Sequence, residues 1–169
     1  MAVLPIRTLP DPVLRKKARK VSSIDRSIKK LVSDMQETLR ADPGRVGLAA
    51  PQVGVSLRIT VIGLPEEEDI ILINPEIVRR KGERQVTEGC LSLPGYFGQI
   101  NRSETVTVKA LDIDGKPVRI KAEGLLAQAL EHEIDHMNGT IYIDHLDSVD
   151  DLRKVEPEEA VVDGPPEPS

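Results

Sequence analysis

The sequence feature that most constrains this chain is the stretch L-E-H-E-I-D-H at residues 130–136, in which three residues separate two histidines. On an α-helix, positions i and i+4 lie one turn apart on the same face, so His132 and His136 can direct two ring nitrogens at one metal ion. Glu133 is turned roughly a quarter of the way round the helix from His132, where its carboxylate can take the proton of a bound water. The plainer alternative is a helix with two surface histidines, so the motif is weighed together with its context.

The residues around this motif have the pattern of an α-helix. Apolar side chains recur at helical spacing from Leu125 to Met137. Gly124 precedes the run, and Asn138-Gly139 is a typical C-terminal stop. This context favours the metal-binding interpretation, and a catalytic ion held by two imidazoles needs a third protein ligand and an open position.

Cys90 is the only thiol in the chain. A free cysteine is ordinarily a small buried hydrophobe, and the role of nucleophile requires a neighbouring base. A third interpretation is metal ligand, because one thiolate and two imidazoles form a site whose fourth position is open to water. We favour the third interpretation, in which Cys90 joins His132 and His136. The remaining histidine, His145, is then expected to be a surface or structural residue.

Helices near the N-terminus and several strands complete the predicted elements. Asp11-Pro12 is typical of the start of a short helix that continues to about residue 18. An apolar stripe over about 25–40 predicts an amphipathic helix that ends at 42–44. The stripe is most simply a core-facing surface, and a partner-binding groove is the minority interpretation. The predicted strands are 57–64, 70–73 with an extension to 78 as an alternative, 105–113, and its hairpin partner 118–122.

Composition narrows the class of protein. A chain of 169 residues suits one domain, and 39% hydrophobic with 30% charged residues is typical of a globular protein. One cysteine cannot form an internal disulfide, and neither a secretory signal nor an apolar run of membrane length is evident, so a cytoplasmic location is expected. Two Tyr, one Phe and no Trp leave little aromatic surface on which single-stranded nucleic acid could stack.

We expect a single domain over residues 1–154 and a disordered tail over 155–169. The tail holds five acids, no bases and four prolines. It accounts for the whole net charge of −5, because the other residues hold 23 acids and 23 bases. A neutral body with an acidic tail argues against direct binding of nucleic acid and offers no basic segment for docking on a ribosome.

Three sequence blocks, in this order and spacing, strongly resemble peptide deformylase: G-L-A-A-P-Q at 47–52, E-G-C-L-S at 88–92 and H-E-I-D-H at 132–136. The similarity extends from about Pro5 to Leu146. It implies an α+β fold, with mixed or antiparallel sheets packed around a central metal-binding helix. It also implies a hydrolase that removes the formyl group from N-formyl-methionine of new polypeptides, in transient proximity to the ribosome. The implied cofactor is one divalent metal per chain, usually Fe(II), with Zn(II) or Ni(II) as substitutes.

The resemblance further implies roles for individual residues. A metal-bound hydroxide attacks the formyl carbon, while Glu133 takes the proton of the water and returns it to the leaving amine. The side-chain amide of Gln52 and the backbone N–H of Leu91 are the implied donors to the oxyanion. Glu88, paired with Arg102, is implied to hold the ligand geometry from the outer shell. The implied metal ligands are Cys90, His132 and His136, and the implied substrate contacts are Gly47, Val46, Leu125, Gln128 and Ala129.

Three positions depart from the usual family pattern. Arg45 replaces a glycine, so we expect either backbone strain, if φ is positive there, or a side chain that reaches the cleft. Glu131 replaces a glutamine and adds a negative charge beside the metal. Gln128 occupies a commonly apolar place in the wall of the methionine pocket. The competing interpretations are a zincin-like metallopeptidase, which gives Cys90 no role, and a non-catalytic metal-binding homologue, which would require loss of Glu133 or a ligand.

Overall fold

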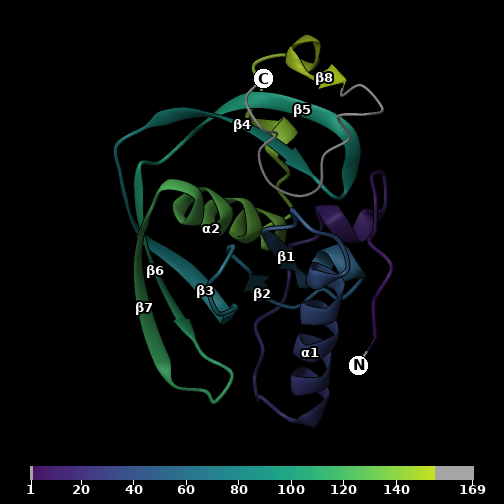
Figure 1. Cartoon of the computed structure of the whole chain (residues 1–169), viewed down its shortest axis with the longest axis vertical. Coiled ribbons are helices and arrows are strands. Elements are labelled where there is room, and N and C mark those ends of the chain that lie inside the picture. Colours follow the sequence, from purple (N-terminus) through teal and green to yellow (C-terminus); the bar gives the residue numbers. More distant parts are fainter. Residues whose placement is uncertain (1, 155–169) are drawn as a thin grey trace.

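The structure, a computed structural model, describes residues 2–154 (Figure 1). Over these residues, two α-helices combine with two antiparallel sheets, which confirms the predicted α+β class. The predicted disordered tail lies outside the described residues, and the division into a domain and a tail stays a prediction. Neither α-helix of the described part has the length and apolarity needed to cross a bilayer.

Both N-terminal helices start at an aspartate cap. Asp25 Oδ1 accepts a hydrogen bond of 3.0 Å from Ile28 N, and the helix that follows matches the predicted range of 25–40. Asp11 caps a single 3₁₀ turn in the same way, so the first helix is shorter than predicted. The helices are η1 Pro12–Arg15, α1 Arg26–Arg40, η2 Ala50–Val53, α2 Gly124–Met137, η3 Tyr142–His145 and η4 Val149–Asp151.

The strands form a five-stranded sheet in the order β1-β2-β3-β6-β7 and a three-stranded sheet in the order β4-β5-β8 (Figure 1). The predicted hairpin is β6–β7, in which Val108 lies opposite Ile120. Strand β1 is an edge strand, with β2 as its single neighbour in the described sheet. The strands are β1 Gly47–Ala49, β2 Ile59–Ile62, β3 Ile70–Lys81, β4 Arg84–Cys90, β5 Leu93–Arg102, β6 Thr105–Leu111, β7 Pro117–Glu123 and β8 Arg153–Lys154.

Strand β3 is much longer than the favoured prediction, because the chain passes through Asn74-Pro75 without ending the strand. Asn74 adopts a φ of 54°, and its side chain both accepts from Val21 N and donates to Val21 O. The register with β6 shifts after Ile73, so the bulge accommodates a proline that cannot donate a ladder hydrogen bond. Strand β2 is shorter than the predicted 57–64, and the long pair β4–β5 was not predicted.

Helix α2 lies between the two sheets (Figure 1). Its apolar side chains, such as Leu130 and Ile134, join a core with the five-stranded sheet, whose other face is covered by α1. Ten of the 14 residues of α2 are buried, including polar ones such as Gln128 and Glu131. Buried polar groups need hydrogen-bond partners, so the polar face of α2 must find them inside the protein.

Candidate metal centre

Cys90, His132 and His136 come together at the junction of strand β4 and helix α2. Cys90 is the last residue of β4, and the two histidines lie one turn apart on α2. His136 Nε2 is 3.2 Å from His132 Nε2 and 3.2 Å from Cys90 Sγ, and the three candidate ligand atoms all lie within 4.8 Å of one another. All three side chains are buried, so the structure gathers the predicted ligand set at one point.

The chemistry of these donors fits a divalent metal ion. Nitrogen and sulfur ligands of a zinc-like ion lie roughly 3.3–3.6 Å apart at ordinary bond lengths, close to the separations in the structure. His132 Nδ1 contacts Glu88 Oε1, which leaves Nε2 as the ring atom that faces the other donors. Burial lowers the pKa of His136 well below its ordinary value. A neutral His136 has a lone pair available for a metal.

The sulfur of Cys90 receives two hydrogen-bond donors. Ser92 N lies 3.4 Å from Cys90 Sγ, and Gln52 Nε2 lies 3.7 Å from it. Donors of this kind favour the thiolate over the thiol, and the thiolate is the form that binds metals.

Gln52 is fully buried, and its amide orientation is set by the backbone. Ala49 N donates a 3.0 Å hydrogen bond to Gln52 Oε1, so the oxygen is engaged and the NH₂ group turns toward Cys90 and Ser92. The 3₁₀-helix η2, which starts just after β1, places this side chain next to the candidate ligands. An NH₂ group fixed in this direction can donate to an oxygen that develops negative charge beside the metal.

Glu133 is 1% exposed and packs against the backbone of strand β1 at Gly47. A Cβ atom at Gly47 would lie 2.5 Å from Glu133 Oε2 and 3.0 Å from its Cδ. The φ angle of Gly47 is not in the left-handed region, so the glycine is required for close approach rather than for backbone conformation. The carboxylate of Glu133, the residue that follows His132, is thus packed directly against strand β1.

Replacement of Gly47 by alanine should therefore displace the carboxylate of Glu133. Because a misplacement of about 1 Å can cost up to about 100-fold in rate, we expect kcat to fall by 10- to 100-fold with the metal content unchanged. Formate release and metal analysis measure the two quantities. Gly63→Ala is the matched control, since its Cβ would also be crowded, at 3.1 Å, but by Leu39 and Asp69. Native kcat in Gly47→Ala would show that Glu133 is not held by this contact.

Glu88 and Arg102 form a buried ion pair directly behind His132. Arg102 donates from Nη2 to Glu88 Oε1 at 2.5 Å and from Nε to Glu88 Oε2 at 3.0 Å. The Nη1 atom of Arg102 donates to Asp135 Oδ2 at 2.7 Å. Burial alone would raise the pKa of Glu88, but the adjacent His132 and Arg102 outweigh it and hold that pKa well below its usual range. The carboxylate is thus ionised and able to orient the His132 ring.

Removal of the Arg102 charge should destabilise the fold strongly. Arg102→Met would leave the carboxylates of Glu88 and Asp135 buried without their cation, a loss of about 3–5 kcal/mol in the free energy of unfolding. Urea denaturation measures this quantity. Arg40→Met is the control, because Arg40 pairs with Asp69 at an exposed site, where such pairs contribute about 1 kcal/mol or less. Equal effects of the two changes would contradict a special role for the buried pair.

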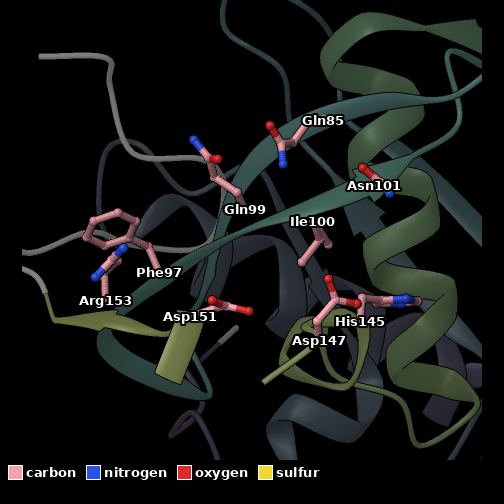
Figure 2. Close-up of a pocket in the computed structure, with 9 residues that line it drawn as sticks. All are labelled: Gln85, Phe97, Gln99, Ile100, Asn101, His145, Asp147, Asp151 and Arg153. Atoms are coloured by element: carbon pink, nitrogen blue, oxygen red, sulfur yellow. The ribbon is translucent and has the colours of Figure 1, made fainter. Parts of the chain in front are cut away.

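The polar contacts behind the metal centre continue to the surface at His145. Its Nε2 lies 2.9 Å from Asp135 Oδ2, and the ring is exposed, in agreement with the predicted surface or structural role. His145 borders a surface hollow of about 450 Å³ (Figure 2). None of the three candidate ligands lines this hollow, so it lies outside the metal centre. Its lining comes from β4, β5 and the C-terminal segment, with Gln85, Gln99, Asn101, Asp147 and Arg153 among its side chains.

Two of the departures from the family pattern have clear partners. Arg45 has no positive φ, and its guanidinium turns to α1, where it donates to Thr38 O and pairs with Asp42 at 2.7 Å. Both expected consequences, strain and entry into the cleft, are therefore wrong. Glu131 faces away from the candidate ligands, because its oxygens accept from Ser103 N at 2.7 Å and from Arg80 Nε at 3.1 Å. The negative charge of Glu131 is therefore paired with Arg80 and is not directed at the metal centre.

The residues expected to contact substrate lie around the start of α2 and strand β1. Val46 and Ala129 belong to the same core cluster, and Leu125 in the first turn of α2 is 37% exposed. Gln128 is buried, with its amide directed at Glu88 and Thr87. Leu91 lies in the turn between β4 and β5, next to Cys90. Substrate contacts at these positions stay predictions, as does the oxyanion role of the Leu91 N–H.

Two residues that take part in the site were not predicted. Ser92 supplies a backbone donor to Cys90, and Asp135 is the second carboxylate bound by Arg102. Asp135 lies three residues after His132, so it projects from a neighbouring part of the same helix surface. The three-residue spacing from His132 could have predicted that Asp135 takes part in the site. The sequence gives no such signal for Ser92, because its backbone contact depends on a turn that its side chain does not specify.

Comparison with known proteins identifies the family. A family model described as Polypeptide deformylase matches residues 3–151. A peptide deformylase of Dehalococcoides mccartyi is 58% identical over 160 residues, which cover 94% of this chain and 95% of the relative. A peptide deformylase of Thermomicrobium roseum is 48% identical over 167 residues, with 94% of each chain covered. The chain belongs to the polypeptide deformylase family.

Solved structures agree with this assignment. The crystal structure of a peptide deformylase from Legionella pneumophila superposes with a TM-score of 0.84 at 51% identity, covering 88% of each chain. A peptide deformylase from Ehrlichia chaffeensis, crystallised in complex with actinonin, gives a TM-score of 0.85 at 44% identity, covering 89% of this chain and 92% of that one. The resemblance inferred from the three sequence blocks is therefore confirmed.

Proposed function

We propose that this protein is a hydrolase that removes the formyl group from the N-terminal formyl-methionine of newly synthesised polypeptides and releases formate. The observation that carries the proposal is the convergence of Cys90, His132 and His136 beside the buried carboxylate of Glu133, in a chain of the deformylase family. Nascent chains are its partners, and the cytoplasm, where they are made, is its expected location.

Cys90, His132 and His136 would hold one divalent metal ion, with Fe(II) as the expected ion and Zn(II) or Ni(II) as substitutes. When bound, such an ion acidifies a water and polarises a carbonyl oxygen. The protein prepares this site through Glu88, which fixes the ring of His132, and through the donors from Ser92 and Gln52 to the sulfur.

Glu133 moves the proton in the proposed reaction. Its carboxylate takes a proton from the attacking water and delivers it to the amine that leaves when the C–N bond of the formamide breaks. The close contact with Gly47 keeps the carboxylate from turning away between these two steps. The products are formate and a peptide with a free N-terminal amine, so no further reactant is required.

Gln52 stabilises the negative charge that develops on the formyl oxygen. Its NH₂ group already points toward Cys90, since its oxygen is engaged by Ala49 N. A donor fixed before the reaction needs no reorganisation as the charge grows, and removal of one such donor commonly costs about 100- to 1,000-fold in rate. The Leu91 N–H is proposed as the second donor.

The peptide would bind along the outer edge of strand β1. Gly47 begins this strand, and β2 is its single neighbour in the described sheet. A strand edge that is not paired with a second strand offers backbone donors and acceptors that an extended peptide can pair with independently of its sequence. This mode suits an enzyme that must accept many nascent chains, with the selection made at the formyl-methionine end.

The two competing functions explain fewer observations. A zincin-like peptidase gives no role to Cys90, which here lies 3.2 Å from His136 Nε2. A non-catalytic homologue would not require Glu133 or its glycine contact, and both are present.

The proposal is tested by the products formed from three tripeptides: formyl-Met-Ala-Ser, acetyl-Met-Ala-Ser and unmodified Met-Ala-Ser. Metal-loaded protein, handled without oxygen, should release formate from the first and leave the other two largely intact. Free amino acids from Met-Ala-Ser would favour the peptidase. Absence of formate from protein with one metal per chain would contradict the proposed function.

A further inference from the structure

Gln128 on helix α2 points its amide at the residue behind the metal ligand His132. It is 5% exposed, and its Nε2 lies 3.2 Å from Glu88 Oε2 and 3.3 Å from Thr87 O. An amide buried on a helix is costly unless it is hydrogen-bonded, and these two acceptors on β4 satisfy both of its N–H groups. The side chain is therefore committed to Glu88 rather than to an apolar pocket wall.

Glu88 thereby has a partner for each direction in which its carboxylate can accept. Glu88 Oε1 contacts His132 Nδ1 and Arg102 Nη2. Glu88 Oε2 accepts hydrogen bonds from Arg102 Nε at 3.0 Å and from Gln128 Nε2. A carboxylate offers about four acceptor positions, so this one is fully used. The last torsion of a glutamate side chain has broad minima, which makes such external partners the main restraint on the carboxylate plane.

We propose that Gln128 is a positioning residue for the metal centre: it fixes the carboxylate of Glu88, which in turn fixes the ring of His132 and slows loss of the metal. The inference rests on the proposed metal site and extends it to a side chain that acts on His132 through Glu88. An apolar residue at this position could not supply the donor. This role differs from the place in the wall of the methionine pocket that the family pattern implies for the position.

The first test uses Gln128→Leu, which removes the donor and nearly keeps the volume. Wild-type and variant proteins are loaded with cobalt(II) under nitrogen and challenged with excess chelator, and metal release is followed by the visible cobalt bands. Changes to partners of metal ligands typically cost 10- to 100-fold in metal affinity, so release should be at least about tenfold faster. Gln36→Leu is the matched control, because Gln36 on α1 also donates from Nε2 to a carboxylate, that of Asp69, at 3.0 Å. It should release cobalt at the wild-type rate.

A second variant, Gln128→Glu, keeps the size of the side chain but sets a carboxylate against Glu88. Release should be faster still than from Gln128→Leu, and the cobalt bands of both variants should shift as the ligand geometry changes. Circular dichroism of each variant confirms that it is folded before the comparison. The KM of metal-loaded Gln128→Leu for formyl-Met-Ala-Ser should remain within about twofold of wild type.

Wild-type release rates and unshifted bands in both folded variants would overturn the inference, as would a lowered KM with unchanged metal release. The second result would assign Gln128 to the methionine pocket. Neither result would affect the proposed function, which fails separately if wild-type protein binds no metal or releases no formate.

Discussion

Replacement of Glu133 by alanine is expected to lower kcat for formyl-Met-Ala-Ser at least about 100-fold while the metal stays bound, because the removed carboxylate is the proposed proton carrier and not a ligand. Its position supports this separation of roles. Glu133 is buried against Gly47, adjacent in sequence to His132, and the candidate ligand atoms converge without it. The quantities to measure are formate release and metal per chain.

Glu133→Gln sharpens this prediction, since glutamine has nearly the same size and cannot take a proton. Its kcat should be as low as that of Glu133→Ala. Glu123→Ala, which removes an exposed carboxylate at the residue before α2, is the control and should keep the native rate. Full activity in Glu133→Gln would exclude a proton-transfer role. Loss of the metal in Glu133→Ala would show that the carboxylate supports the site in some other way.

Replacement of Cys90 by alanine is expected to abolish metal binding, and activity with it. The sulfur lies 3.2 Å from His136 Nε2 and receives donors from Ser92 and Gln52, as a bound thiolate would. After loading with metal and removal of the unbound metal by gel filtration, wild-type protein should hold about one metal per chain and Cys90→Ala almost none. Cys90→Ser should behave like the alanine variant, because a serine hydroxyl stays protonated at neutral pH and is a poor replacement for thiolate.

The metal content of Cys90→Ala separates the three interpretations of this cysteine. A nucleophile would leave the metal in place and remove the activity. A small buried hydrophobe, which the 2% exposure of Cys90 alone would suggest, would leave both nearly unchanged apart from a modest loss of stability. Loss of both together, with a folded protein by circular dichroism, is the outcome expected for a ligand.

The elements that sequence periodicity predicted well are those with one clear apolar face. Helix α1 runs over Arg26–Arg40 within the predicted range, because its buried stripe repeats at helical spacing and Asp25 caps it. The hairpin β6–β7 was predicted equally well from alternating residues on either side of Asp114-Gly115, although Leu111 and Pro117 are the last paired residues, so the connection is longer than a two-residue turn. The ligand triad was inferred from the spacing of two histidines and the presence of a single cysteine, and the structure brings those three side chains together.

The elements that sequence reasoning missed depend on contacts between distant segments. Strands β4 and β5 combine glycines and polar residues, and their buried residues pack against Leu14 and the C-terminal residues Ile141 and Tyr142, contacts that no local pattern records. Strand β3 continues through Asn74 because that side chain binds the backbone of Val21, 53 residues earlier. The family resemblance implied a place for Gln128 in the pocket wall, which stays a prediction, but it did not indicate that the amide would donate to Glu88 and Thr87, because those contacts depend on how α2 packs beside β4.

The central claim is that Cys90, His132 and His136 hold the one metal ion on which deformylation depends. The most direct measurement is a titration of metal-stripped protein with Fe(II) under nitrogen, in which formate release from formyl-Met-Ala-Ser is recorded after each addition. We predict almost no formate before metal is added, a linear rise with added metal, and a sharp break at one ion per chain. Formate release that is independent of added metal, or a rate that stays at zero once one ion per chain is bound, would contradict the claim.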